Sequence, residues 1–278
     1  LLRSLVLVAG CLHCVDPAAT TPPPGTTQSQ RPDGNGSQVL PPRVDPFSHA
    51  VAVAADRAFL GRGGELIVFE LGQSTQPREL GRVQLEGEVR DIALAGPYAF
   101  VALRGAGLSI VNCSRPEEPI QVSLFELPLA EGVDVSRDRA YVAAQTGGLR
   151  VLDVSNPAAP RELGSYQTLE AALKVEIQSS LAYVAASYAG MRILDVGDPA
   201  RISEVGFATR KSYGQGAAWN VTVSGDRAFS AIPDNGLRQV DVKDPGKAET
   251  LSIYRKLHAP VAVVVKGRHA FVADQSAG

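Results

Sequence analysis

The sequence predicts an all-β fold, a β-propeller of four-stranded blades, from three observations. A strand, a glycine turn, a second strand and a proline turn occupy residues 141–160 (YVAAQTGGLRVLDVSNPAAP), and close copies lie on both sides. Four short strands in about 42 residues is the spacing of a propeller blade, and no 3.6-residue helical period accompanies it. The aromatic residue of the repeated strand returns after 41, 41, 42, 46 and 42 residues, at Phe59, Phe100, Tyr141, Tyr183, Phe229 and Phe271.

The composition is that of a globular chain with a substantial core. Of the 278 residues, 45% are hydrophobic and 20% are charged, and the formal net charge is −2. A protein that binds nucleic acid through its phosphates needs a clear basic excess, so DNA and RNA are excluded as expected partners.

The first ten residues (LLRSLVLVAG) indicate export. One basic residue precedes an apolar run that is too short to span a bilayer, so residues 1–10 are interpreted as the end of a secretory signal. Residues 8–11 (VAGC) resemble a bacterial lipobox, which implies a lipid-modified Cys11, a membrane anchor and an extracytoplasmic location. The alternative is an ordinary signal peptide with an incidental cysteine.

Residues 11–46 are expected to form a disordered tether. Pro, Thr, Gly, Ser and Gln dominate this segment, and its few apolar residues cannot offset the entropy of ordering. Cys11 and Cys14 have the spacing of a redox or zinc pair, but no βαβ context and no second ligand pair follows.

The predicted folded domain runs from residue 47 to residue 278. The sixth copy stops at its glycine turn after two strands, which predicts five full blades, a partial sixth, an open or strained arc and a chain truncated at its C-terminus. In the third copy the four strands are expected at residues 132–135, 139–144, 149–154 and 161–167.

The second halves of the copies carry the specific signal. The segments GLSIVNCSRPEEP, GLRVLDVSNPAAP, GMRILDVGDPARI and GLRQVDVKDPGKA resemble the LVIVD repeat of bacterial and archaeal surface proteins. The resemblance covers about residues 50–278. It implies a β-propeller, an extracytoplasmic location and a binding scaffold, and it supplies no catalytic residue.

Recurring acidic residues at the end of the third strand are interpreted as turn architecture. Asp153, Asp195 and Asp241 lie in separate blades, so they cannot surround one calcium ion, and an Asp before such a turn accepts backbone N–H bonds. Cys113 aligns with valines of the other copies and is expected to be a small buried apolar residue.

The fifth copy departs from the repeat and is the candidate ligand site. Its entry segment (TRKSYGQGAAWN, 209–220) carries the extra residues of the 46-residue spacing and contains the only Trp, and its glycine turn carries Asp234. We expect Tyr213, Trp219, Asn220 and Asp234 to bind an unknown protein or glycan at one propeller face, because deviations from a repeat rule accompany function. The alternative is that Trp219 packs between blades.

No catalytic residue, metal site or cofactor is expected. The histidines, His49 and His258 among them, lie in no nucleophile or metal pattern, and no glycine loop cradles a phosphate. The sequence therefore favours a non-enzymatic surface scaffold. The alternative is a secreted carbohydrate hydrolase that uses the inner-strand carboxylates Asp91, Asp134 and Glu176.

Overall fold

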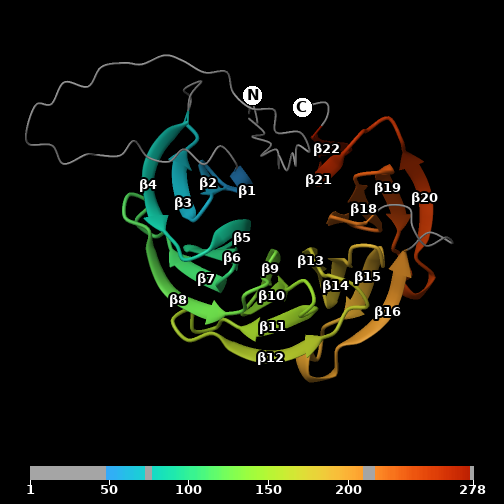
Figure 1. The fold of residues 1–278 in the computed structure, drawn as a ribbon, viewed down its shortest axis with the longest axis horizontal. Coiled ribbons are helices and arrows are strands. Elements are labelled where there is room, and N and C mark those ends of the chain that lie inside the picture. The colour runs from blue at the N-terminus through green and yellow to red at the C-terminus, as the bar shows by residue number, and fades with distance from the viewer. Residues whose placement is uncertain (1–47, 73–76, 209–216, 276–278) are drawn as a thin grey trace, which may run out of the picture.

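The structure is a computed structural model that describes residues 48–72, 77–208 and 217–275. The described chain forms five four-stranded antiparallel sheets and one two-stranded sheet, arranged as an arc (Figure 1). In every four-stranded sheet the strands lie in chain order, the first strand innermost and the fourth outermost. The predicted propeller of five blades and a partial sixth is confirmed, and the arc is open between blade 1 and blade 6.

The blades are numbered along the chain. Blade 1 comprises β1 (Ser48–Ala54), β2 (Arg57–Arg62), β3 (Glu65–Glu70) and β4 (Arg78–Gln84). Blade 2 comprises β5 (Glu88–Ala95), β6 (Tyr98–Arg104), β7 (Gly107–Asn112) and β8 (Ile120–Glu126). Blade 3 comprises β9 (Gly132–Ser136), β10 (Arg139–Ala143), β11 (Leu149–Asp153) and β12 (Arg161–Tyr166), all within a residue or so of the predicted strands.

Blade 4 comprises β13 (Lys174–Gln178), β14 (Leu181–Ala185), β15 (Met191–Asp195) and β16 (Ser203–Ala208). Blade 5 comprises β17 (Asn220–Ser224), β18 (Arg227–Ile232), β19 (Gly236–Asp241) and β20 (Glu249–Tyr254). Blade 6 is the hairpin of β21 (Pro260–Lys266) and β22 (His269–Asp274). One-turn 3₁₀ helices, η1 (Pro199–Arg201) and η2 (Pro245–Lys247), precede the fourth strands of blades 4 and 5.

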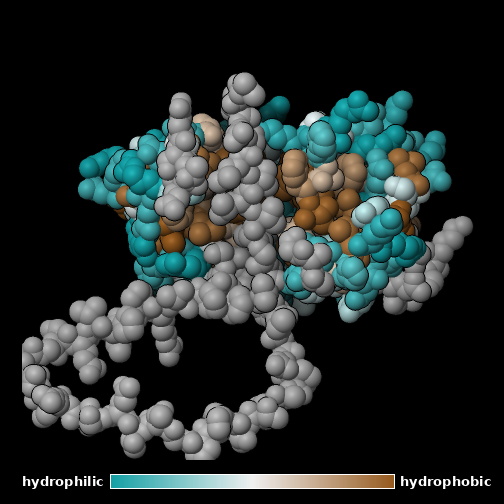
Figure 2. Space-filling view, turned by 90° about the horizontal axis from the view of Figure 1, so that it is seen from above, coloured by the Kyte–Doolittle hydropathy of each residue, from teal (hydrophilic) through white to brown (hydrophobic). Residues whose placement is uncertain are grey.

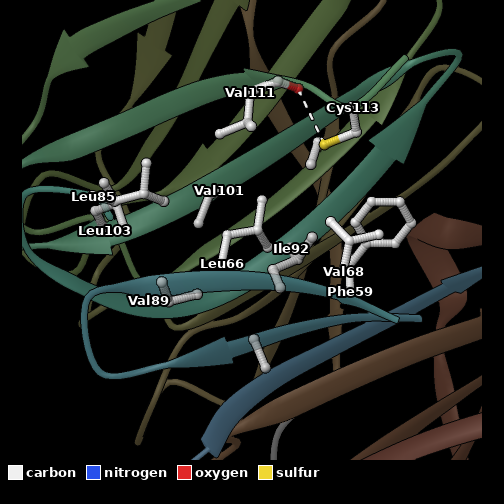
Figure 3. Close-up of a cluster of buried hydrophobic side chains, with 12 residues drawn as sticks. Phe59, Leu66, Val68, Leu85, Val89, Ile92, Val101, Leu103, Val111 and Cys113 are labelled. Carbon is white, nitrogen blue, oxygen red and sulfur yellow. Dashed lines mark hydrogen bonds between the residues drawn. The ribbon is translucent and has the colours of Figure 1, made fainter. Parts of the chain in front are cut away.

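The core lies between the blades. In blades 1 to 4 the recurring aromatic residue of the second strand packs against the next blade. Four separate apolar clusters join blades 1 and 2, 2 and 3, 3 and 4, and 4 and 5. Figure 3 shows the first cluster, in which Phe59, Leu66 and Val68 of blade 1 meet Ile92, Val101 and Cys113 of blade 2. Each sheet therefore needs a neighbour on both faces, which explains the imperfect alternation of the strands.

A second contact joins the blades at their outer rim. In each four-stranded blade the fourth strand bulges by one residue opposite the third strand. The residue after the bulge is Gly or Ser, and in blades 1 to 4 it lies against the proline turn of the next blade. An added Cβ would come within 1.9 Å of the Pro199 carbonyl oxygen at Gly164 and 1.8 Å of the Pro245 oxygen at Gly206. The Ser123 hydroxyl donates to the Pro157 oxygen at 2.6 Å.

The close approach at Gly164 yields a test of this rim contact. We expect Gly164→Ala to lower the free energy of unfolding by about 1–3 kcal/mol, because the methyl group overlaps a backbone oxygen that cannot rotate away. Gly246→Ala is the matched control, since its Cβ would meet nothing closer than 3.6 Å. Urea unfolding measures both. Equal stability of the two variants would show that the rim contact does not hold the blades together.

Candidate functional site

One end of the blades carries both the turns between second and third strands and the segments that link successive blades. Isolated antiparallel bridges join the two sets at Arg104 and Leu129, at Gln145 and Ala172, and at Ser187 and Ala218. We call this surface the turn face. The bridges show that these turns and linking segments share one face of the propeller.

Large apolar side chains protrude from the turn face. Trp219 is 43% exposed and Tyr188 is 65% exposed, and each lies next to a residue of the bridge between Ser187 and Ala218. Leu129 and Leu169, on the two preceding linking segments, are exposed as well. Tyr188 was missing from the predicted ligand residues, although its place in the glycine turn of blade 4 was recognisable from the repeat.

The other three predicted ligand residues differ in their positions. The Asn220 side-chain oxygen accepts the Val263 N–H at 3.3 Å, and its backbone oxygen accepts the Ser230 hydroxyl at 3.1 Å, so Asn220 links blades 5 and 6. Asp234 is exposed in the turn between β18 and β19 and lies on the turn face. Tyr213 lies outside the described residues.

A buried acidic residue organises the turn face between blades 2 and 3. The Glu131 side chain is 5% exposed, and its two oxygens accept from Arg90 Nε at 2.9 Å and from Arg104 Nε at 2.6 Å. The Gln145 amide also donates to Glu131. Two guanidinium groups and an amide compensate the buried charge, so Glu131 is a structural anchor of this face.

The inner-strand carboxylates bind the next blade. Asp91 accepts the Val133 N–H at 2.8 Å, Asp134 accepts the Ile177 N–H at 2.7 Å, and Glu176 accepts the Val223 N–H at 3.1 Å. Asn220 makes the equivalent bond to Val263. We call these four bonds the inter-blade latches. They satisfy donors on the channel-facing edge of the innermost strands, which would otherwise lack partners.

Lys174 adds an ion pair that spans two interfaces. Lys174 lies in blade 4, and its ammonium group contacts the Asp91 carboxylate of blade 2. The side chain reaches across blade 3 at Gly132, the first residue of β9. A Cβ at Gly132 would lie 2.8 Å from the Leu173 oxygen and from the Lys174 Cα, so only glycine permits this approach.

The channel groups have shifted pKa values. Burial raises the pKa of Asp134 and of Glu176 from the ordinary carboxyl value, and this effect is larger than the opposing effect of their backbone N–H bonds. Burial acts to lower the pKa of Lys174, but the attraction and hydrogen bond of Asp91, with the nearby Asp134 and Glu176, raise it overall.

The turn acids and Cys113 have the predicted structural roles. Each acidic side-chain oxygen accepts the N–H two residues ahead, at 3.0 Å for Asp153, 2.9 Å for Asp195 and 3.0 Å for Asp241. Asp153 also accepts the Ser155 hydroxyl, and these bonds lower its pKa. Cys113 is buried, its thiol donates to the Val111 carbonyl at 3.8 Å (Figure 3), and burial raises its pKa to about 11.

Two further findings concern the described part of the chain alone. None of its His, Cys, Asp and Glu side chains cluster in a way that could hold a metal ion. Within the same ranges, no helix has the length and apolar character required to cross a bilayer.

Comparison with known proteins supports the repeat assignment. Four tandem stretches, residues 86–125, 129–168, 171–209 and 215–254, match the LVIVD repeat and together cover more than half of the chain. No curated protein matches.

Two solved structures are similar in fold. The computationally designed Ika8 protein has a TM-score of 0.61 and 12% identity over 82% of this chain and 68% of its own. The β-propeller domain of Cps50 (Swd1) from Myceliophteria thermophila has a TM-score of 0.63 and 12% identity over 78% of this chain and 75% of its own.

The raised pKa of Asp134 predicts an unusual pH dependence. The folded state holds the Asp134 proton more tightly than the unfolded chain does, since the carboxyl pKa of the unfolded chain is about 3.9. Protonation of Asp134 therefore stabilises the fold as pH falls through the folded-state pKa. Asp134→Asn keeps an acceptor for Ile177 and removes the buried charge. We expect the free energy of unfolding of this variant, relative to that of the wild type, to be higher near pH 7 than near pH 3.

Asp153→Asn is the control, because its effect on stability should depend on pH in the opposite direction. The lowered pKa of Asp153 means that its ionised form stabilises the fold above the unfolded pKa and that this stability is lost as pH falls. Asp153→Asn should therefore destabilise the protein near pH 7 and have little effect near pH 3. Unfolding free energies measured across this range give both results, and parallel curves for the two variants would contradict the assignment.

Proposed function

The chain belongs to the LVIVD repeat family, and on this basis we propose that it is a non-enzymatic binding scaffold whose ligand site lies on the turn face. The observation that carries the proposal is the exposed pair Tyr188 and Trp219, held beside one backbone bridge between blades 4 and 5. Large aromatic side chains that stay exposed in a rigid frame are typical anchors of binding surfaces.

The surroundings of this pair support a protein or glycan ligand. Leu129 and Leu169 extend the apolar surface along the linking segments, and Asp234 supplies a charged acceptor on the same face. In this proposal Asn220 acts indirectly, since its bond to Val263 fixes the strand that follows Trp219. Tyr213 remains a candidate contact from residues 209–220.

We also propose that the propeller acts outside the cytoplasm, anchored to a bacterial membrane or cell surface. The support is the sequence of residues 1–46, which combines a signal-like apolar run, a lipobox-like VAGC with Cys11 and a Pro/Thr/Gly-rich segment. A long tether would present the turn face to ligands away from the membrane.

A carbohydrate hydrolase is the second candidate, and one observation favours it. Asp134 and Glu176 come from adjacent blades and both have raised pKa values, as a general acid requires. Their bonds to Ile177 and Val223 favour the structural role instead. Turnover in a glycoside hydrolase screen that is lost in Asp134→Asn and Glu176→Gln would support the enzyme.

The scaffold proposal is tested by removing the exposed aromatic pair. Trp219→Ala and Tyr188→Ala should each weaken binding of a hit from a glycan array or a surface-protein panel at least about tenfold, as loss of a binding anchor does. The melting temperature should stay near that of the wild type, because Tyr188 is 65% exposed and Trp219 is 43% exposed.

Phe207→Ala is the matched control, since this exposed aromatic lies on the outermost strand of blade 4. Its binding should equal that of the wild type. Equal affinity in all three variants would refute the ligand site, and unfolding of Trp219→Ala would assign Trp219 a packing role between blades.

A further inference from the structure

Blade 5 carries polar side chains at interface positions that are apolar in other blades. Blade faces are apolar, as the brown surface on both sides of the grey atoms in Figure 2 shows. Register places Ser230 of β18 at the position of Val142 in blade 3 and Val184 in blade 4, which lie in the apolar clusters. Ser230 is 1% exposed, and Arg238, its cross-strand partner on β19, is 3% exposed. A polar group buried in an apolar interface is costly unless it is hydrogen-bonded, so both side chains need partners.

In blades 3 and 4 the residue equivalent to Arg238 is an arginine that binds an acid of its own blade. Arg150 Nη1 donates to Glu162 Oε1 at 2.9 Å, and Arg192 Nη1 donates to Glu204 Oε1 at 3.0 Å. Each acid lies on the fourth strand and pairs with the residue two places after the arginine. These ion pairs direct the guanidinium groups of blades 3 and 4 toward their own outermost strands.

Blade 5 has a threonine in place of this acid, and its arginine reaches the neighbouring blade instead. Register places Thr250 of β20 at the position of Glu162 and Glu204, and Thr250 is exposed. Arg238 Nη1 donates to the backbone oxygen of Ala208, the last residue of β16 in blade 4, at 3.3 Å. The guanidinium group therefore crosses the interface to the point at which the chain leaves blade 4 for blade 5.

The cross-strand partner of Arg238 holds the other end of the same linking segment. The Ser230 hydroxyl donates to the Asn220 backbone oxygen at 3.1 Å, and Asn220 directly follows Trp219. The Trp219 N–H donates to the Ala231 oxygen at 3.1 Å. Both ends of the segment between β16 and β17 are thus anchored on adjacent positions of β18 and β19.

We propose that Arg238 is a positioning residue of the ligand site on the turn face. Its guanidinium group fixes the start of the linking segment that ends in Trp219, and Thr250 permits this contact because a neutral hydroxyl competes for a guanidinium group less strongly than a carboxylate does. A Trp219 side chain that is held in place loses less conformational freedom when it binds a ligand. The inference rests on the proposed function only where it makes Trp219 a ligand contact.

Thr250→Glu tests the proposal by restoring the acid of blades 3 and 4, which should draw Arg238 away from Ala208. Trp219 is the only Trp of the chain, so its fluorescence reports on this segment alone. We expect stronger quenching of that fluorescence by acrylamide. Hydrogen exchange of the Trp219 amide should become at least about tenfold faster, the change that loss of a hydrogen bond to a charged group produces. The midpoint of urea unfolding should stay near that of the wild type, because Thr250 is exposed, and this separates positioning from a purely structural role.

Thr250→Gln is the matched control, because the amide has the length of the Glu side chain without its charge, and its quenching and exchange should equal those of the wild type. Arg238→Met should itself increase quenching, and Thr250→Glu should add nothing in that background, because no guanidinium group is left to move. The proposal is overturned if Thr250→Glu leaves Trp219 unchanged, or if it has the same effect with and without Arg238. None of these measurements uses a ligand, so their outcome is decided separately from the binding test on Trp219→Ala.

Discussion

The structure depends on the stacking of sheets that are apolar on both faces. A blade such as blade 3 has Val151 facing blade 4 and Leu152 facing blade 2, so it cannot bury its core alone. Stability is therefore a property of the interfaces between blades. The interfaces have three parts, which are the apolar clusters, the inter-blade latches at the channel and the glycine and proline contacts at the rim.

The inter-blade latches explain why the channel is polar although the interfaces are apolar. The innermost strands have one edge without a neighbouring strand, and its N–H groups need acceptors that do not close the channel. Asp91, Asp134 and Glu176 supply them from the preceding blade, and Lys174 compensates part of their charge. The need for these acceptors gives a structural reason for the three inner-strand carboxylates, which in the sequence also resemble a catalytic set.

The turn face is under weaker constraint. Its segments are connected by single bridges, and side chains such as Tyr188 and Trp219 are exposed on it. Variation there leaves the apolar clusters intact, which is why propellers can place recognition on this face.

The sequence by itself determined the blade period, the strand positions and the roles of Asp153 and Cys113, because these follow from local pattern and from alignment of the copies. Only the tertiary structure decided the roles of Asp91 and Asn220, because their partners Val133 and Val263 lie about one blade ahead in the chain. It also decided that Tyr188 and Trp219 each follow a residue of the same bridge, Ser187 and Ala218. Contacts between blades depend on stacking geometry, which no single repeat encodes.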